Sequence, residues 1–410
     1  MVKTLIERGH EEEVRVQANQ GDWFCACGLA KELDSRGDRT AVLNVLTPYA
    51  DTGWTKAAET VARFLSGWGR AAEAISLIRP LAESGDRLAI NCLADLLARD
   101  GRIDDVIDLL GPRTSDWFHA GALVRLTEGL GRDDLILELL PSASPHDRRP
   151  SHHPVELRAR VLERQGRADE AMLFLRTHID AGLAVNVNHV EQLADLMIRH
   201  DRLGELRDLM AGRGGCHAAH RLASFLAGQG EVDLAVQELS PFIEEGSLNT
   251  AAIAAALLAE HGRADEAIEI LRRAAAEHGN EDWVARMLSD LLVSQGRADE
   301  ALAYAVELAA QPGWTPDEVL LLRAHVLATS GRRDQAISEL RSHPDAGEWW
   351  VANVLAALLA EDGQLDEAIE VLRQPGCAAG GNDTDLAMLL VQTGRVKEAI
   401  EASHVRSARA

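Results

Sequence analysis

The stretch Gly262-Arg-Ala-Asp-Glu-Ala-Ile268 decides the fold, because its pattern of glycine, charged residue, paired acids, alanine and apolar residue recurs along the chain. Close copies begin at Gly166, Gly296 and Gly363. Looser copies begin at Gly9, Gly37, Gly69, Gly101, Gly131, Asp201, Gly230, Gly331 and Gly394. The eleven intervals between Gly37 and Gly394 cover 357 residues, a mean near 32. A period of this length indicates a solenoid built from small repeated units.

Each unit contains two amphipathic helical patterns, one on either side of the motif. Apolar residues between Trp283 and Leu292 recur at helical spacing before Gly296, and those between Ala298 and Ala309 do the same behind it. Glycine at that position is typical of a left-handed helix C-cap. The repeating unit is therefore predicted to be an antiparallel helix pair.

Composition and charge restrict the class of protein. The 410 residues include 42 Lys plus Arg and 65 Asp plus Glu, which gives a formal net charge of −23. Such a surface argues against binding of nucleic acid or anionic lipid. With 46% apolar and 26% charged residues the chain is expected to fold, and with only 4% aromatic residues its core must consist of Leu, Ala, Val and Ile.

The cysteines and the apolar segments bear on the compartment. Five cysteines without framework spacing predict free thiols in a reducing environment. The first residues lack the apolar segment of a secretion signal, and the longest apolar run, Ala251 to Ala259, is too short to cross a membrane. We therefore expect a cytoplasmic protein without a membrane segment.

The motif resembles that of the tetratricopeptide-repeat family, in which a glycine lies at the turn between helices, an alanine five residues later and a leucine eight residues earlier. The pairs Gly262/Ala267, Gly296/Ala301, Gly331/Ala336 and Gly363/Ala368 match it, with Leu288 and Leu355 at the earlier position. The shorter Sel1-type helix-pair repeats are similar as well, since the aromatic positions of the family are mostly aliphatic here. The resemblance implies an all-α, right-handed α-solenoid of about twelve helix pairs.

The family resemblance also implies a function in protein binding, as a scaffold or regulator and not as an enzyme. Members usually bind extended peptides along a concave groove formed by the first helix of each pair. Counted back from each turn, the groove positions are Phe118, Arg125, Glu156, Arg160, Glu191, Asp195, Trp283, Arg286, Asp290, His325, Trp350 and Asn353. An acidic, partly aromatic groove favours basic or mixed-charge partners. Only four of the 42 basic residues are lysines, a bias expected of a high-GC bacterial genome.

Two irregularities bear on the organisation of the array. The segment 141–154 holds four prolines and predicts a loop or hinge between an N-terminal part, 1–140, and a C-terminal part, 155–410, or a surface insertion on one continuous solenoid. Neither end carries a clear polar capping element, so an end face is expected to pair with another copy, as a homodimer, or the terminal helices to pack atypically.

The sequence holds no catalytic signature, and we expect no metal and no cofactor. The loop residues His146, His152 and His153 lack a carboxylate or Cys partner and are interpreted as solvated. Cys216, His217 and His220 are interpreted as packing at a helix start. The paired acids of the repeated motif recur at one structural position, so we expect them to stabilise the N-terminus of each second helix.

Two alternatives of other classes remain open. One is a solenoid enzyme or small-molecule sensor with its site inside the superhelix, near Cys216/His217/His220 or Trp283/Arg286/Asp290. The other is a nucleic-acid-associated regulator that uses the arginine pairs Arg148-Arg149 and Arg272-Arg273, although the acidic total disfavours nucleic acid.

Overall fold

The computed structural model describes residues 2–141, 152–181, 185–278, 281–374 and 383–407. Within these ranges the chain forms 26 α-helices and no strand, which confirms the all-α solenoid. The helices alternate about the positive-φ turns, in agreement with the predicted array of about twelve helix pairs, and the short helices α1(Val2–Glu7) and α2(Glu11–Asn19) flank the turn at Gly9. No helix of the described ranges is both long and apolar enough to span a membrane.

The chain divides into two compact units. We call residues 11–225 the N-terminal unit, and residues 1–10 together with 226–410 the C-terminal unit. Besides α2, the N-terminal unit contains α3(Trp23–Ser35), α4(Arg39–Ala50), α5(Thr55–Gly67), α6(Ala71–Glu83), α7(Arg87–Arg99), α8(Ile103–Leu110), the short 3-10 turn η1(Gly111–Arg113), α9(Trp117–Leu126), α10(Asp133–Leu139), α11(His152–Arg164), α12(Ala168–Ala181), α13(Val187–Arg199) and α14(Leu203–Met210). Besides α1, the C-terminal unit contains α16(Val232–Glu244), α17(Leu248–Glu260), α18(Ala264–His278), α19(Asp282–Ser294), α20(Ala298–Ala309), α21(Pro316–Thr329), α22(Arg333–Ser342), α23(Trp349–Glu361), α24(Leu365–Leu372), α25(Asp383–Gln392) and α26(Val396–Ser407). Helix α15(Gly215–Gly228) contains the boundary between the units.

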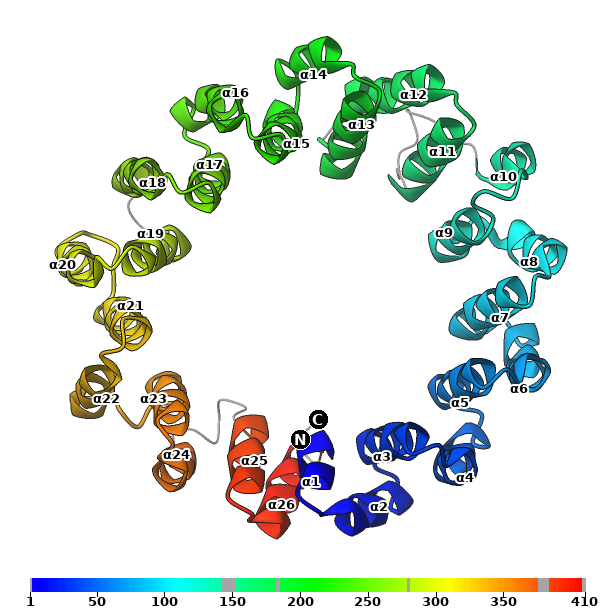
Figure 1. The fold of residues 1–410 in the computed structure, drawn as a ribbon, viewed down its shortest axis with the longest axis horizontal. Helices are drawn as coiled ribbons and strands as arrows, with labels where there is room; N and C mark the ends of the chain where they lie inside the picture. Colours follow the sequence, from blue (N-terminus) through cyan, green and yellow to red (C-terminus); the bar gives the residue numbers. More distant parts are fainter. Residues whose placement is uncertain (1, 142–151, 182–184, 279–280, 375–382, 408–410) are drawn as a thin grey trace. The chain divides into compact units, whose positions relative to one another are not determined.

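Within each unit the helices form two layers (Figure 1). The odd-numbered helices, which are the first of each pair, lie on the inner side of the curve, and the even-numbered helices lie on the outer side. Successive inner helices contact one another, as α5 does α7 and as α17 does α19. Ala267 and Ala301, the small residues of the motif, are fully buried in the core of the C-terminal unit, where a methyl side chain lets two helices approach closely.

A left-handed residue ends the first helix of each pair. At Gly296, where φ is 73°, the glycine N–H donates to the carbonyl of Val293 at 2.9 Å, and the N–H of Arg297 donates to that of Leu292 at 2.9 Å. These two bonds form a Schellman cap, which satisfies carbonyls at the end of the helix. Every turn residue of the thirteen motif copies has a positive φ, including Asp201, the one non-glycine residue of the described chain in this conformation.

Asp201→Gly is expected to raise the free energy of unfolding by about 0.5–1 kcal/mol, because glycine adopts a positive φ without the steric cost that a Cβ imposes. The backbone of Asp201 has φ 55°. Gly262→Ala is the matched opposite change, since φ there is 77° and a Cβ would meet no atom within 4 Å, so only backbone strain acts. We expect it to cost about 1 kcal/mol. Urea unfolding followed by circular dichroism measures both, and a destabilised Asp201→Gly variant would contradict this account.

The charged residues of the motif connect neighbouring repeats on the outer layer. Arg263, which directly precedes α18, contacts Glu266 of that helix at 2.6 Å and Asp233 of the preceding pair at 2.5 Å. Arg297 repeats this arrangement with Glu300 and with Asp265, at 2.7 and 2.8 Å. The sequence predicted that these acids serve the repeat, and the contact to the preceding pair is the feature that it missed.

This arrangement shifts the pKa of its carboxyl groups. Hydrogen bonds from Arg297 and Arg272 lower the pKa of Glu300 to about 2. Arg272 of α18 thus pairs with Glu300 at 2.9 Å. In the arginine pair Arg272-Arg273, which was considered for nucleic-acid contact, Arg272 is therefore already paired within the repeat array. The other arginine pair, at positions 148–149, lies outside the described residues.

Helix α11 packs on α9 and α10, the helices that precede the proline-rich segment. Arg164 contacts Asp133 at 2.6 Å and donates to the carbonyl of Val124 at 2.7 Å. Arg158 donates to the carbonyl of Leu137 at 3.0 Å. Residues 142–151 lie outside the described ranges, and a domain boundary at 141–154 stays a prediction.

The first helix of the chain belongs to the C-terminal unit. Helix α1 contacts α25, and Arg8 donates to the carbonyl of Val391 at 3.2 Å and to that of Gln392. These carbonyls lie at the end of α25, where backbone acceptors lack helical partners. The sequence offered atypical terminal packing as one of two expectations, and this contact is of that kind. Pairing of two copies stays a prediction.

Candidate functional site

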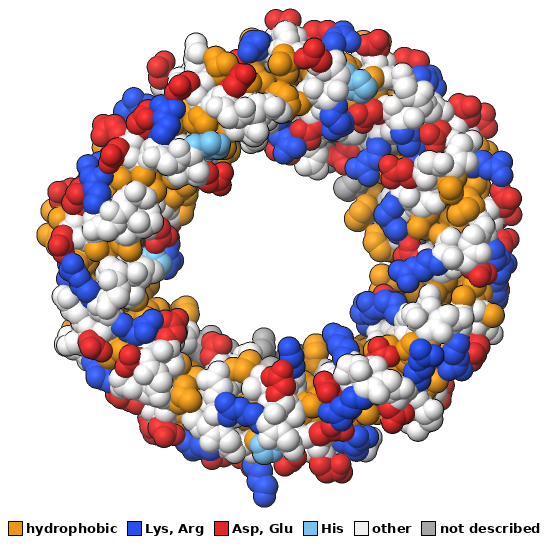
Figure 2. Space-filling view, viewed as in Figure 1, with side chains coloured by type: hydrophobic (Ala, Val, Ile, Leu, Met, Phe, Trp, Pro, Cys, Tyr) orange, Lys and Arg blue, Asp and Glu red, His pale blue; other side chains and the backbone are white. Residues whose placement is uncertain are grey.

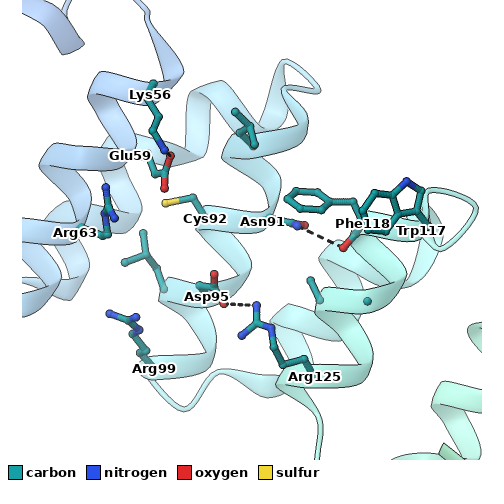
Figure 3. A pocket seen from close by; sticks show the side chains of 14 residues that line it. Lys56, Glu59, Arg63, Asn91, Cys92, Asp95, Arg99, Trp117, Phe118 and Arg125 are labelled. Carbon is teal, nitrogen blue, oxygen red and sulfur yellow. Dashed lines mark hydrogen bonds and ion pairs between the residues drawn. The ribbon is translucent and has the colours of Figure 1, made fainter. Parts of the chain in front are cut away.

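A pocket of about 440 Å³ opens on the inner layer of the N-terminal unit. It lies over the three successive inner helices α5, α7 and α9, as Figure 3 shows. Phe118 and Arg125, two of the predicted groove residues, line it. One part of its wall is apolar and aromatic, and the rest is strongly charged.

The aromatic part of the wall comes from the start of α9. The carboxylate of Asp116 accepts from the N–H of Phe118 at 2.9 Å and so caps the helix. The guanidinium of Arg87, which contacts Asp116 at 2.7 Å, stacks on the rings of Phe118 and Trp117 at 4.8 and 5.6 Å. These contacts of Arg87 and Asp116 hold the start of α9 in place. Trp117 and Leu88 are each 48% exposed, so the aromatic surface remains accessible.

The charged part of the wall carries four cations and two carboxylates. Lys56 contacts Glu59 at 3.0 Å, and Arg125 of α9 contacts Asp95 of α7 at 2.8 Å. The remaining cations are Arg63 of α5 and Arg99 of α7, which line the same pocket. Figure 2 shows Lys and Arg side chains gathered on the inner face of this part of the chain.

Cys92 lies between the two parts of the wall, and its chemistry excludes a thiolate nucleophile at neutral pH. Burial raises the pKa of the thiol to about 12, and the negative charges of Glu59 and Asp95 add to the increase, while Arg63 and Arg99 oppose it. Because a thiol with this pKa stays protonated at pH 7, the pocket is suited to binding and not to covalent catalysis by Cys92.

The other predicted groove residues of the N-terminal unit lie further along the inner layer. Glu156 and Glu191 are half-buried on α11 and α13, and Arg160 is exposed. Asp195 of α13 forms a two-bond ion pair with Arg221, at 2.6 and 2.7 Å. The polar positions of successive inner helices therefore pair with one another instead of presenting a uniformly acidic surface.

In the C-terminal unit, three predicted residues come together beside a pocket of about 620 Å³ that is lined by α19, α21 and α23. His325 accepts at Nδ1 from Arg286 at 3.2 Å, and its Nε2 contacts the carboxylate of Asp290. Because a guanidinium can only donate, Nδ1 is the acceptor in the contact with Arg286, and Nε2 faces the carboxylate of Asp290. The cluster is a polar clamp between two neighbouring inner helices.

The remaining predicted residues lie apart from this cluster. Trp283 is 37% exposed and donates from Nε1 to Glu281 at 3.0 Å. Trp350 is half-buried, with its ring 6.0 Å from that of His343. Asn353 is half-buried on α23. Arg286 and His325 line the pocket, whereas the two tryptophans do not.

The histidine groups give little support to a metal site. The rings of His217 and His220 lie 5.9 Å apart, and burial, followed by the charge of His217, lowers the pKa of His220. The side chains of the three loop histidines fall outside the described residues. Within the described part of the chain, Asp317, His343 and Asp345 form a group in which one carboxylate or imidazole atom of each residue could coordinate a metal ion. These atoms lie within 4.8 Å of one another. The sequence did not indicate this group, because its members become neighbours only when α21 packs against α22.

The comparison with protein families finds a helical repeat in one part of the chain. Residues 258–313, which include α18, α19 and α20, match the tetratricopeptide repeat family. This part of the chain is similar to the tetratricopeptide repeat that its motif resembles. No curated protein sequence matches the chain.

Several solved structures are similar to this chain at low identity. Naa15/Naa10 bound to HypK-THB is 11% identical, with 97% of this chain and 73% of that chain covered and a TM-score of 0.42. Yeast Tom70 is 13% identical, with coverages of 100% and 94% and a TM-score of 0.33. The pentatricopeptide repeat protein PPR10, in complex with an 18-nt psaJ RNA element, is 17% identical, with coverages of 99% and 62% and a TM-score of 0.38.

Proposed function

We propose that this protein is an interaction scaffold that binds an extended peptide segment of a partner protein along its inner helix layer. The observation that carries the proposal is the pocket over α5, α7 and α9, which combines an accessible aromatic surface with charged groups. Interfaces of this kind concentrate their binding energy in aromatic and arginine side chains. The polar clamp of Arg286, Asp290 and His325 offers a second contact in the C-terminal unit.

We also propose a bacterial source, a cytoplasmic location and a partner charge for this scaffold. The predominance of arginine over lysine supports a high-GC bacterial source, and the free cysteines support a reducing compartment such as the cytoplasm. The net charge of −23 favours basic or mixed-charge partners for the surface as a whole. A scaffold, and not an enzyme, is also favoured by the protonated Cys92 thiol in the pocket.

The test is a selection of displayed random 12-residue peptides on the immobilised full chain, followed by fluorescence polarisation with the enriched peptides. Gly121→Trp is expected to abolish binding at the pocket, because Gly121 lines it and a Cβ there meets no atom within 4 Å. Gly204→Trp is the matched control on the outer helix α14, where a Cβ also meets no atom within 4 Å.

Enriched peptides that the control variant binds like the wild type, and that the Gly121→Trp variant or an Arg286→Glu variant loses, would support the scaffold. Loss of binding in the Arg286→Glu variant alone would place the peptide in the C-terminal unit. A selection that enriches no peptide, or binding unchanged in both variants, would overturn the proposal.

A further inference from the structure

The pocket of the N-terminal unit has a local charge opposite to that of the whole chain. Its wall holds the four cations and two carboxylates described above, in a protein of net charge −23. Both carboxylates are already paired, Glu59 with Lys56 and Asp95 with Arg125. Within the described residues, Arg63 and Arg99 have neither a hydrogen bond nor an ion pair, and both side chains are exposed.

These two guanidiniums come from the successive inner helices α5 and α7 and line the same pocket. In Figure 3 they lie on the side of Cys92 that faces away from Phe118 and Trp117. Both act electrostatically on the Cys92 thiol, which places their charges near the centre of the pocket. A guanidinium presents a rigid fork of N–H donors that matches the two oxygens of a carboxylate. The pocket therefore offers an unused anion-binding edge.

An apolar surface lies next to this edge. Leu88 and Trp117 are each 48% exposed, and the ring of Phe118 is held by the stacked guanidinium of Arg87. A ligand that contacts both parts of the wall needs a large apolar group and a negative group a short distance apart. The volume of about 440 Å³ suits a few side chains and not a folded domain.

We propose that this pocket binds an acidic peptide segment of the partner protein, with an Asp or Glu side chain on Arg63 and Arg99 and a large apolar side chain on Leu88, Trp117 and Phe118. The inference rests on the proposed scaffold function and specifies the chemistry of the partner. It differs from the expectation for the whole surface, because the local charge at the contact outweighs a distant net charge that salt screens.

The same surface disfavours a nucleic acid. Paired carboxylates interrupt the cations within the pocket, and the next inner helices carry Glu163 and Asp195, which pair with Arg199 and Arg221. A nucleic-acid strand needs a continuous run of unneutralised cations along its phosphates. Among the described residues of the inner helices, the unpaired guanidiniums are Arg63 and Arg99 in the pocket and Arg160 on α11, which do not form a continuous run, and the pair in the pocket suits one or two carboxylates.

The experiment uses the peptides enriched by selection on the full chain. We expect their sequences to combine Phe, Leu or Trp with a nearby Asp or Glu. Fluorescence polarisation of the best labelled peptide is expected to show at least tenfold weaker binding to the double variant Arg63→Gln/Arg99→Gln, and a similar loss when its acidic residues are changed to the corresponding amides. The control Arg79→Gln/Arg273→Gln removes the same charge from the outer helices α6 and α18 and should bind like the wild type.

Four results would overturn the inference. Enriched peptides that lack acidic residues, or that bind equally to the Arg63→Gln/Arg99→Gln variant, would leave the scaffold function in place and remove the acidic partner. An 18-nucleotide oligouridine that binds the wild type, displaces the peptide and is lost in the same variant would assign the pocket to nucleic acid. Failure to enrich any peptide would overturn both the inference and the scaffold.

Discussion

Leu288→Ala is expected to lower the free energy of unfolding of the C-terminal unit by about 2–5 kcal/mol. Leu288 is fully buried at the centre of a cluster that draws side chains from α16 to α21, including Leu258, Leu292 and Val326. Truncation removes apolar contacts and leaves a cavity, because the surrounding helices are fixed by their own neighbours and cannot close the gap completely.

The measurement is urea unfolding of the full chain followed by circular dichroism, with Val306→Ala as the control. Val306 lies on α20 of the same unit with 57% of its surface exposed, so its truncation should change the stability by less than about 0.5 kcal/mol. In a repeat array each pair is stabilised mainly by its neighbours, so the loss at Leu288 should also lower the stability of the pairs around it. Equal midpoints for the two variants would contradict the assignment of Leu288 to the core.

The second large effect is expected at Arg164, where Arg164→Met should cost about 3–5 kcal/mol. The side chains of Arg164 and Asp133 are only 12% and 16% exposed, and their atoms are 2.6 Å apart. Removal of the guanidinium leaves the Asp133 carboxylate largely buried without its counter-charge, and it also removes the donor to the carbonyl of Val124. This pair connects α11 to α10 across the proline-rich segment.

The double variant Arg164→Met/Asp133→Leu separates the lost charge pair from lost packing. Because it removes both charges, it should recover at least half of the stability that Arg164→Met loses. Arg132→Met is the surface control, since Arg132 and Asp104 are 49% and 81% exposed, and we expect a change within about 0.5 kcal/mol. A double variant less stable than the single one would show that packing, and not the unpaired carboxylate, dominates at this position.

The helix pairs and their turns could be predicted from the sequence because their causes are local. The apolar period defines each helix over a dozen consecutive residues, and the glycine of each motif supplies the positive φ that the turn requires. The spacing of the motif copies predicted a turn at Asp201, where glycine is absent. Asp201 has the same left-handed backbone as the turn glycines.

Contacts between neighbouring repeats were beyond the reach of local patterns. The sequence shows that Arg263 precedes Asp265 and Glu266, yet its second partner, Asp233, lies thirty positions earlier. The two polar contacts of His325 likewise come from Arg286 and Asp290 of another helix. Such pairs depend on how one helix pair stacks on the next.

The sequence by itself determined the all-α solenoid, the repeating helix pair and the placement of Phe118 and Arg125 on the inner layer. Only the tertiary structure decided the charge of the pocket and which of its cations stay unpaired. Arg63, Arg99 and Trp117 come from three helices, and the pairing of every neighbouring acid had to be known before two guanidiniums could be recognised as free. The physical reason is that helix formation depends on adjacent residues, whereas a binding surface depends on packing between repeats about thirty residues apart.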